Sequence, residues 1–250
     1  MNLTGNTIFI TGGGSGIGRG LAEALQERGN QVIISGRRKS HLEAVVKANP
    51  GMASIELDLQ DPESIASVAK KLIAQYPKLD ILINNAGIMQ IDDAAGVVDD
   101  ALLVSTVNTN LLGSIRMTSA FIEHLKKQPA ATVIYNTSVL GFVPLAMTAV
   151  YSSTKAALHS YVLSQRYKLK NTTVRVIEIA PPWVQTDLLG SNDEPRAMPL
   201  AEFIKETVEV LGTGAQEVLV ERAKGLRNNP GPKEGAFVTQ FNDSMSGQQS

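Results

Sequence analysis

The sequence contains no cysteine among its 250 residues. This absence excludes structural disulfides, thiolate catalysis and cysteine-ligated zinc, and it is typical of a reducing compartment. Histidine is scarce as well: His41, His124 and His159 are far apart and show no metal-ligand spacing. We therefore expect no metal site, and we expect each histidine to be structural or surface-exposed.

Long hydrophobic runs and an excess of one charge are also missing. No apolar run approaches the ~20 residues that a membrane-spanning helix needs, and only seven residues precede the first strand-like run at 8–10, too few for a signal peptide. The net charge is −1 and the basic residues are scattered, a pattern that does not favour nucleic-acid binding. The expectation is a cytoplasmic protein without nucleic-acid or membrane partners.

What the sequence does have is an alternation of short apolar runs with helix-length segments. The runs are rich in β-branched residues and apolar throughout, which is typical of strands buried on both faces; they lie at 7–11, 32–35, 54–57, 81–83, 132–135 and 174–179. Such alternation predicts βαβ units with right-handed crossovers. We expect one α/β domain over 1–250, a doubly wound Rossmann fold whose mostly parallel seven-stranded sheet has helices on both faces.

One segment differs from this pattern. Residues 187–199 are polar, contain glycine and proline, and show no clear periodicity. We expect a mobile substrate loop over about 187–212; a plain surface connection is the alternative interpretation.

A glycine-rich turn follows the first predicted strand, with the sequence TGGGSGIG at 11–18. Glycines allow unusual φ values and a close approach of the backbone to a pyrophosphate, which helix N-terminal N–H groups then face. A purely structural turn is the alternative. The residues of the turn that we expect to bind a dinucleotide are Gly12, Gly14, Ser15, Gly16, Ile17 and Gly18.

The second predicted strand ends in Ser35-Gly36-Arg37-Arg38. An acidic residue here would accept hydrogen bonds from the 2′-hydroxyl of the adenosine ribose and select NAD. Gly36 has no carboxylate, and both arginines carry bidentate donors suited to the 2′-phosphate of NADP. The sequence therefore predicts NADP(H) as the preferred cofactor, with NAD(H) as the second candidate; two solvent-exposed arginines at a helix start are the alternative.

The third predicted strand leads into Asp58 and Leu59. Asp58 is a candidate acceptor for the adenine amino group, and Leu59 lies beside it. Asp58 is also a candidate N-cap of the next helix, although Asp61 fits that role better.

From the fourth predicted strand onward, the sequence resembles the short-chain dehydrogenase/reductase family. The resemblance covers about residues 5–190. It rests on motifs that occur in order after predicted strands or on helices: Asn84-Asn85-Ala86-Gly87, Asn110, Thr137-Ser138, Tyr151-x-x-x-Lys155 and Pro181-Pro182-Trp183-Val184-Gln185-Thr186. A Tyr-x-x-x-Lys pair alone decides little, but the ordered set is specific.

The resemblance implies a catalytic set of Asn110, Ser138, Tyr151 and Lys155. It also implies cofactor contacts from Asn85, Ala86, Gly87, Tyr151, Lys155, Pro181, Val184 and Thr186. The family usually has Pro-Gly where this chain has Pro181-Pro182, and the second proline removes an N–H, so the nicotinamide contacts need not follow the family pattern.

The implied reaction moves a hydride between NADP(H) and a carbonyl/alcohol pair, with Tyr151 as general acid/base. Lys155 lies one helical turn away on the same face. Bringing the pKa of a phenol near neutrality requires about 4 kcal/mol, and one positive charge about 4 Å away at an effective dielectric near 20 supplies that much. We therefore expect Lys155 to lower the pKa of Tyr151, Ser138 to hold the substrate oxygen, and Asn110 to hold a water that links Lys155 to solvent.

The substrate wall is expected to be mostly apolar, which suits a ketone, an aldehyde or an aromatic carbonyl; its residues are Ser138, Leu140, Phe142, Tyr151 and Trp183. The same apolar residues fit a core or a subunit contact. Two other functions stay open: an NAD-linked polyol or sugar dehydrogenase, and a non-catalytic dinucleotide-binding sensor. The resemblance also implies a homodimer or homotetramer; candidate contact residues, which burial within the subunit would equally explain, are Leu102, Leu103, Val107, Phe121, Leu158 and Tyr161.

Overall fold

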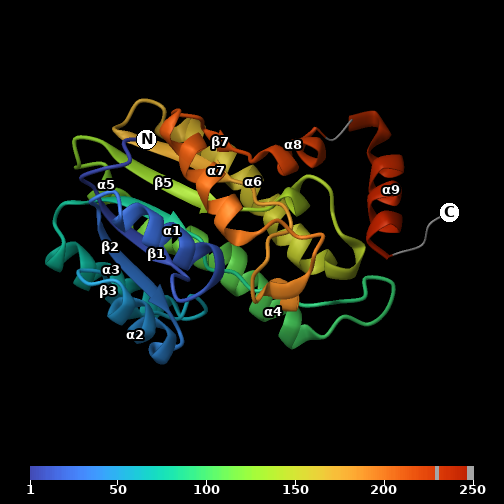
Figure 1. The fold of residues 1–250 in the computed structure, drawn as a ribbon, viewed down its shortest axis with the longest axis horizontal. Helices are drawn as coiled ribbons and strands as arrows, with labels where there is room; N and C mark the ends of the chain where they lie inside the picture. The colour runs from blue at the N-terminus through green and yellow to red at the C-terminus, as the bar shows by residue number, and fades with distance from the viewer. Residues whose placement is uncertain (229–230, 247–250) are drawn as a thin grey trace.

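The computed structural model describes residues 1–228 and 231–246, and a parallel sheet forms its centre (Figure 1). The described strands follow the order β3-β2-β1-β4-β5-β6-β7. Their bounds are β1 Thr7–Thr11, β2 Gln31–Gly36, β3 Ala53–Glu56, β4 Leu79–Asn84, β5 Ala131–Asn136, β6 Val174–Ile179 and β7 Glu217–Val218. The single-domain doubly wound fold is confirmed, and every pairing in the sheet is parallel. In the described part of the chain, no helix is both long enough and apolar enough to span a bilayer.

Helices cover both faces of the sheet because each carries an apolar stripe. One face packs against α1 Gly16–Gln26, α2 Lys39–Ala48, α7 Leu200–Gly212 and α8 Glu221–Arg227. The other packs against α3 Pro62–Gln75, α5 Gly113–Leu125 and α6 Ala149–Leu169. Two further helices, α4 Asp100–Val107 and α9 Glu234–Ser246, lie toward one end of the molecule, away from β2 and β3 (Figure 1). Apolar strands between two helical layers are typical of parallel sheets.

The expected loop over 187–212 is shorter in the structure than the sequence predicts. Residues 200–212 form α7, whose buried Phe203 and Ile204 pack against α1. Gly20 makes this contact close, because a Cβ there would lie 2.7 Å from the Ile204 side chain. The apolar residues of 200–212 recur at helical spacing, and this signal outweighs the loop-like composition before Pro199.

The carboxyl ends of the parallel strands meet at one edge of the sheet. There the chain diverges from β1, which pairs with β2 on one side and β4 on the other. Crevices at such a switch point are the usual ligand sites of doubly wound folds. The glycine turn after β1, the Asn85–Gly87 segment after β4, Ser138 after β5 and Pro181 after β6 all border a cavity of about 1100 Å³ at this edge.

Candidate active site

The glycine turn forms a tight cradle at one end of the cavity. Gly12 has φ +70° and Gly16 has φ +53°, both in the left-handed region that glycine adopts readily. A Cβ on Gly18 would lie 2.2 Å from the Gly12 carbonyl oxygen, so no other residue fits there without a shift. The turn is therefore tightly packed on itself while its residues border the cavity, and α1 begins at Gly16 with its N–H groups at this end, as a pyrophosphate site requires.

Side chains after β4 brace this turn. Asn85 Nδ2 donates to the Thr11 carbonyl at 3.0 Å and to the Gly12 carbonyl at 3.3 Å. The Thr11 hydroxyl in turn accepts from the backbone N–H groups of Asn85 and Ala86. Asn85 thus fixes the shape of the cradle, and Asn85, Ala86 and Gly87 all line the cavity.

The predicted 2′-phosphate subsite lies where the chain leaves β2. Gly36, Arg37 and Arg38 line the cavity together with His41. Arg38 donates to the Ser15 hydroxyl at 3.3 Å, which ties it to the glycine turn. Asp58 and Leu59 line the cavity nearby, and the Asp58 carboxylate accepts from the Gln60 N–H. The N-cap of α3 is Asp61, as expected, since its carboxylate accepts from the Glu63 N–H at 2.8 Å.

Three of the four residues expected to be catalytic converge where the cavity meets α6. Tyr151 and Ser138 both line the cavity here, and the Ser138 hydroxyl is near enough to the phenol to lower its pKa. Lys155 is buried and lies 5.4 Å from the centroid of the Tyr151 ring, with its ammonium donating to the Asn136 carbonyl at 2.8 Å. The phenol, hydroxyl and ammonium groups therefore share one wall of the cavity.

The N-terminus of α6 is held by a residue from a distant segment. The carboxylate of Asp92 accepts from the backbone N–H groups of Ala149 and Val150 at 3.1 and 3.0 Å. These are orphan donors of the first helical turn, and a carboxylate also complements the helix dipole there. Tyr151 belongs to that same turn, so Asp92 helps to fix the position of its phenol.

Burial shifts the pKa values of Tyr151 and Lys155 in opposite directions. Burial raises the pKa of Tyr151 to about 12, and the hydrogen bond with Ser138 only partly opposes it. Burial also lowers the pKa of Lys155 to about 8, while the negative charge of Glu178 acts in the opposite direction. In the protein without cofactor, desolvation of the phenolate therefore raises the Tyr151 pKa, and the lowering expected from Lys155 stays a prediction.

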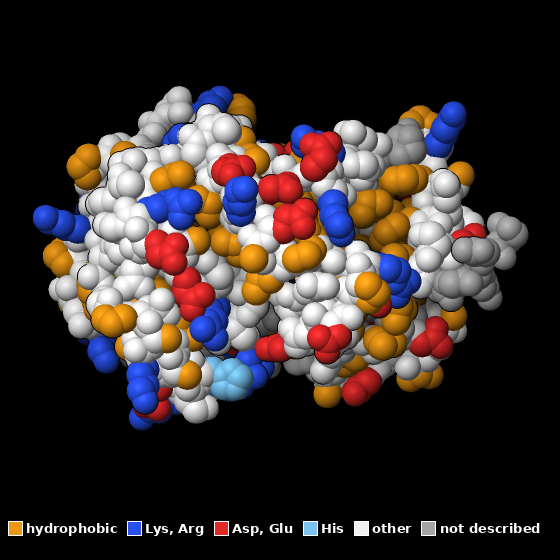
Figure 2. Space-filling model, in the orientation of Figure 1, with side chains coloured by type: hydrophobic (Ala, Val, Ile, Leu, Met, Phe, Trp, Pro, Cys, Tyr) orange, Lys and Arg blue, Asp and Glu red, His pale blue; other side chains and the backbone are white. Residues whose placement is uncertain are grey.

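The cavity widens beyond Tyr151 into a region with mostly apolar walls. Leu140 and Trp183 line it as expected, while Phe142 does not. Phe142 is buried in a separate cluster and stacks edge-on against His159 with ring centroids 4.9 Å apart. The cavity wall also includes Phe241 and Met245 of α9. Figure 2 shows apolar side chains gathered on the inner side of this helix.

The segment between Trp183 and Pro199 is tethered rather than free of structure. Trp183 Nε1 donates to the Ser191 hydroxyl at 2.8 Å. Val184 forms a bridge with Met198, and the flanking backbone N–H of Gln185 donates to the Met198 carbonyl. Between them, residues Leu188–Asp193 form 3-10 turns. Pro181, Val184 and Thr186 reach the cavity at the foot of this segment.

Comparison with known proteins gives the family. The sequence profile of the short chain dehydrogenases matches residues 6–197, which is most of the chain. The chain belongs to the short-chain dehydrogenase/reductase family. An uncharacterized oxidoreductase, DltE of Bacillus subtilis, is 38% identical over 234 residues, covering 91% of this chain and 93% of the relative. The 3-oxoacyl-[acyl-carrier-protein] reductase FabG of Escherichia coli is 32% identical over 222 residues, covering 87% and 88%.

Solved structures agree with this assignment. A short chain dehydrogenase from Burkholderia cenocepacia in complex with NADP superposes with a TM-score of 0.84 at 28% identity, covering 96% of this chain and 98% of that one. A short-chain dehydrogenase/reductase from Burkholderia phymatum in complex with NAD also has a TM-score of 0.84, but at 17% identity it supports the fold alone. The chain is thus an oxidoreductase of a dinucleotide-binding family.

Asn110 lies beside Lys155, since a Cβ on Gly87 would be 3.3 Å from Asn110 Oδ1 and 3.7 Å from Lys155 Nζ. Its Oδ1 accepts from the Ile88 N–H at 2.8 Å, and its Nδ2 donates to the Ile88 carbonyl at 2.8 Å and to the Thr154 hydroxyl. The side chain therefore anchors the segment after Gly87, and the water-holding role of Asn110 stays a prediction. Asn110 lies in a π-helical turn, Asn108–Leu112, between α4 and α5. Such turns are frequent at functional sites of helices.

Other residues of the site carried no clear signal in the sequence. Asn136 ends β5, accepts from Lys155 through its carbonyl, and donates from Nδ2 to Asn85 Oδ1 at 2.9 Å. It thereby connects the lysine to the brace of the glycine turn. Phe241 and Met245 lie in a C-terminal segment that shows no resemblance to the usual family ending. The roles of Asn136 and of the two α9 residues depend on contacts with segments distant in sequence, so only the structure reveals them.

Proposed function

We propose that this protein is an NADP(H)-dependent carbonyl reductase or alcohol dehydrogenase. The observation that carries the proposal is the convergence of Ser138, Tyr151 and Lys155 on one wall of the cavity that the glycine turn borders. A nicotinamide cofactor fits this cavity, because the glycine turn and the N-terminus of α1 border it and its volume exceeds the usual range for one small ligand.

When bound, the cofactor supplies or accepts the hydride. In reduction, the Tyr151 hydroxyl donates a proton to the carbonyl oxygen as negative charge develops on it. Its raised pKa keeps it protonated at neutral pH, so it is ready to act as an acid. Ser138 holds the substrate oxygen within reach of the phenol. Lys155, mostly protonated below pH 8, provides the positive charge near the tyrosine.

The preference for NADP(H) rests on Gly36, Arg37 and Arg38 at the end of β2. Gly36 is followed by Arg37 and Arg38, all three border the cavity, and no carboxylate stands at the position that would select NAD. Guanidinium groups bind phosphate through paired hydrogen bonds. NAD(H) stays the second candidate.

The substrate is proposed to be an apolar ketone, aldehyde or aromatic carbonyl. The wall beyond Tyr151 combines leucine, methionine and aromatic side chains: Leu140, Leu145, Met147, Trp183, Leu188, Leu226, Phe241 and Met245. Burying such surfaces favours an apolar body on the substrate. We further propose a cytoplasmic enzyme that forms a homodimer or homotetramer.

The direct test is a panel of aldehydes and ketones, followed by the loss of NADPH absorbance. Replacing Tyr151→Phe removes the proton donor, and we expect turnover to fall about 10²–10⁴-fold, while NADPH still binds by fluorescence. Tyr167→Phe is the matched control, because Tyr167 lies on the same helix and is 67% exposed. Full activity in Tyr151→Phe would reject Tyr151 as acid/base, and NADPH binding by wild type without any reduction would favour the sensor.

A further inference from the structure

Glu178, a residue of strand β6 in the sheet against which α6 packs, is fully buried. Glu178 of β6 follows Val174 and Val176 on the same face, where the pattern of a buried strand calls for another apolar residue. Its exposed fraction is 0%. A carboxylate at such a position is costly unless it is paired and hydrogen-bonded. Its partners therefore indicate why it is there.

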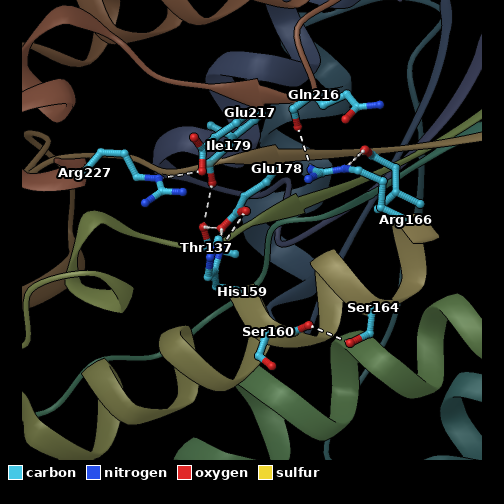
Figure 3. A network of polar contacts seen from close by, with 11 residues as sticks. Thr137, His159, Ser160, Ser164, Arg166, Glu178, Ile179, Gln216, Glu217 and Arg227 are labelled. Carbon is cyan, nitrogen blue, oxygen red and sulfur yellow. Dashed lines mark hydrogen bonds and ion pairs between the residues drawn. The ribbon is translucent and has the colours of Figure 1, made fainter. Parts of the chain in front are cut away.

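Both carboxylate oxygens of Glu178 have partners from neighbouring elements (Figure 3). The Thr137 hydroxyl donates to Oε1 at 2.7 Å. His159 Nδ1 lies 2.8 Å from Oε2 and 3.0 Å from Oε1. Thr137 follows β5 directly and His159 lies on α6, so the carboxylate is held between the sheet and the helix.

These partners adjoin two of the proposed catalytic residues. Thr137 immediately precedes Ser138. His159 lies one helical turn after Lys155, as Lys155 does after Tyr151, so the three form one stripe along α6. The Lys155 ammonium is bonded to the Asn136 carbonyl, on the strand that pairs with β6. Glu178 also acts electrostatically on Lys155, because its negative charge opposes the lowering of the lysine pKa by burial.

The other charges around Glu178 are paired with one another. Glu217 of β7 accepts from Arg227 Nε of α8 at 2.8 Å. The Arg227 guanidinium also lies over the Phe142 ring, at 4.4 Å from its centroid. His159, Glu178 and Glu217 bring their ligand-type atoms within 4.8 Å of one another, but each of these side chains already has a protein partner. Farther along α6, Arg166 donates to the backbone carbonyls of Val176 and Gln216.

We propose that Glu178 is the buried counter-charge of Lys155 and that Thr137 and His159 hold its carboxylate in this role. Glu178 is a positioning residue, since it acts on the reaction through the lysine. An ammonium enclosed by protein loses its proton more readily without an opposite charge nearby. Glu178 thereby extends the pH range in which Lys155 stays charged beside Tyr151. The inference rests on the proposed reductase function.

The test is the pH dependence of kcat/KM for carbonyl reduction, which reports groups of the free enzyme. In wild type, we expect activity to fall as pH rises through about 8, because burial lowers the pKa of Lys155 to about 8. In Glu178→Gln, a nearly isosteric change, we expect this limb to move to lower pH by about one unit. Activity relative to wild type then falls about fivefold at pH 8 and stays nearly unchanged at pH 6.

Glu217→Gln is the matched control, because it removes the same charge from the same cluster but at the Arg227 pair; its limb should stay near pH 8. His159 provides a second pair of variants. His159→Leu removes the partner of the carboxylate and should move the limb in the same direction as Glu178→Gln, whereas His159→Asn retains an N–H donor and should move it less. These variants keep the test decisive if Glu178→Gln does not fold.

The outcomes separate the two proposals. Wild type that binds NADPH but reduces no carbonyl in the panel refutes the function. If wild type is active but kcat/KM falls at the same pH in Glu178→Gln and His159→Leu as in the Glu217→Gln control, the counter-charge role is refuted while the function stands. NADPH affinity, measured by fluorescence across the same pH range, is the second readout. It should weaken as pH rises and Lys155 loses its charge, and this weakening should begin at a lower pH in Glu178→Gln than in wild type, since Lys155 borders the cofactor cavity.

Discussion

At the scale of single residues, burial sets the direction in which the proposed chemistry is easiest. Tyr151, with a pKa raised to about 12, holds its proton throughout the physiological range. Lys155, with a pKa lowered to about 8, keeps its charge at neutral pH but loses it in mild alkali. A protonated phenol suits carbonyl reduction, in which a proton must be donated. Alcohol oxidation needs the opposite form and is therefore expected to gain as pH rises.

The two arginines after β2 should differ in cofactor binding. Arg38 is bonded to Ser15, whereas no partner of Arg37 is found among residues 1–228 and 231–246. We expect Arg37→Ala to raise the dissociation constant of NADPH about 10–100-fold, the value of charge-assisted hydrogen bonds to a phosphate. NADH lacks that phosphate, so its affinity should change by less than about twofold. Fluorescence titration of both cofactors measures the difference.

The control for this change is Arg19→Ala. Arg19 is also a surface arginine near the glycine turn, but it pairs with Glu23 on α1. Its loss should leave both affinities nearly unchanged. Equal weakening of NADPH and NADH in Arg37→Ala would remove the basis for a 2′-phosphate subsite at the end of β2.

At the scale of elements, the shape of the glycine turn depends on close contacts within the turn and with the segment after β4. A Cβ on Gly18 would lie 2.2 Å from the Gly12 carbonyl oxygen and 2.3 Å from Asn85 Nδ2, so Gly18→Ala must displace the backbone of the turn or its brace. We expect a loss of about 1–3 kcal/mol in the free energy of unfolding, measured by urea denaturation. NADPH binding should fall with it.

Gly14→Ala makes the matched comparison within the same turn. Its Cβ would meet the nearest atom, His41 Cβ, at 3.4 Å, and its φ is not in the left-handed region. The unfolding free energy should therefore change by less than about 1 kcal/mol. Similar losses in the two variants would mean that the close approach at Gly18 does not determine the stability of the turn.

Elements with strong local signals could be predicted from the sequence. The predominantly apolar strands β1, β2 and β4 to β6 and the strand–turn–helix around Gly16 follow from residue patterns, since period and glycine spacing are local properties. Strand β7 has two residues, too few for a pattern. Helix α7 directly follows the polar segment 187–199, whose composition predicts a loop that continues to residue 212. Phe142 was misplaced because an apolar residue after a strand fits a ligand wall and a core cluster equally well.

The polar part of the site was harder to predict for a physical reason. Asn110 and Glu178 are each defined by partners distant in sequence, Ile88 for the first and Thr137 and His159 for the second. The residue type gives the chemistry that is available, but only the packing of α6 against β5 and β6 decides which groups meet. Motif spacing therefore located the site and did not determine its hydrogen bonding.

At the scale of the whole molecule, the exposed apolar residues mark a candidate surface for the proposed oligomer. Helices α4 and α6 contact each other, and together they expose Leu103, Val104, Leu163 and Tyr167, the last to 67%. Contiguous exposed apolar side chains are typical of interaction surfaces. Two residues named as contact candidates from the sequence, Phe121 and Leu158, are buried within the subunit and cannot form that surface.

If α4 and α6 form the interface of a homodimer or homotetramer, a charge at its centre should dissociate the subunits. Leu163→Glu would place a carboxylate without a partner against an apolar surface, a change that costs several kcal/mol and raises the dissociation constant by at least about 100-fold. Size-exclusion chromatography with light scattering should then report a smaller particle than wild type. Val97→Lys is the control, because Val97 is 99% exposed outside these helices. A wild-type monomer, or an unchanged assembly in Leu163→Glu, would show that this face is not the subunit contact.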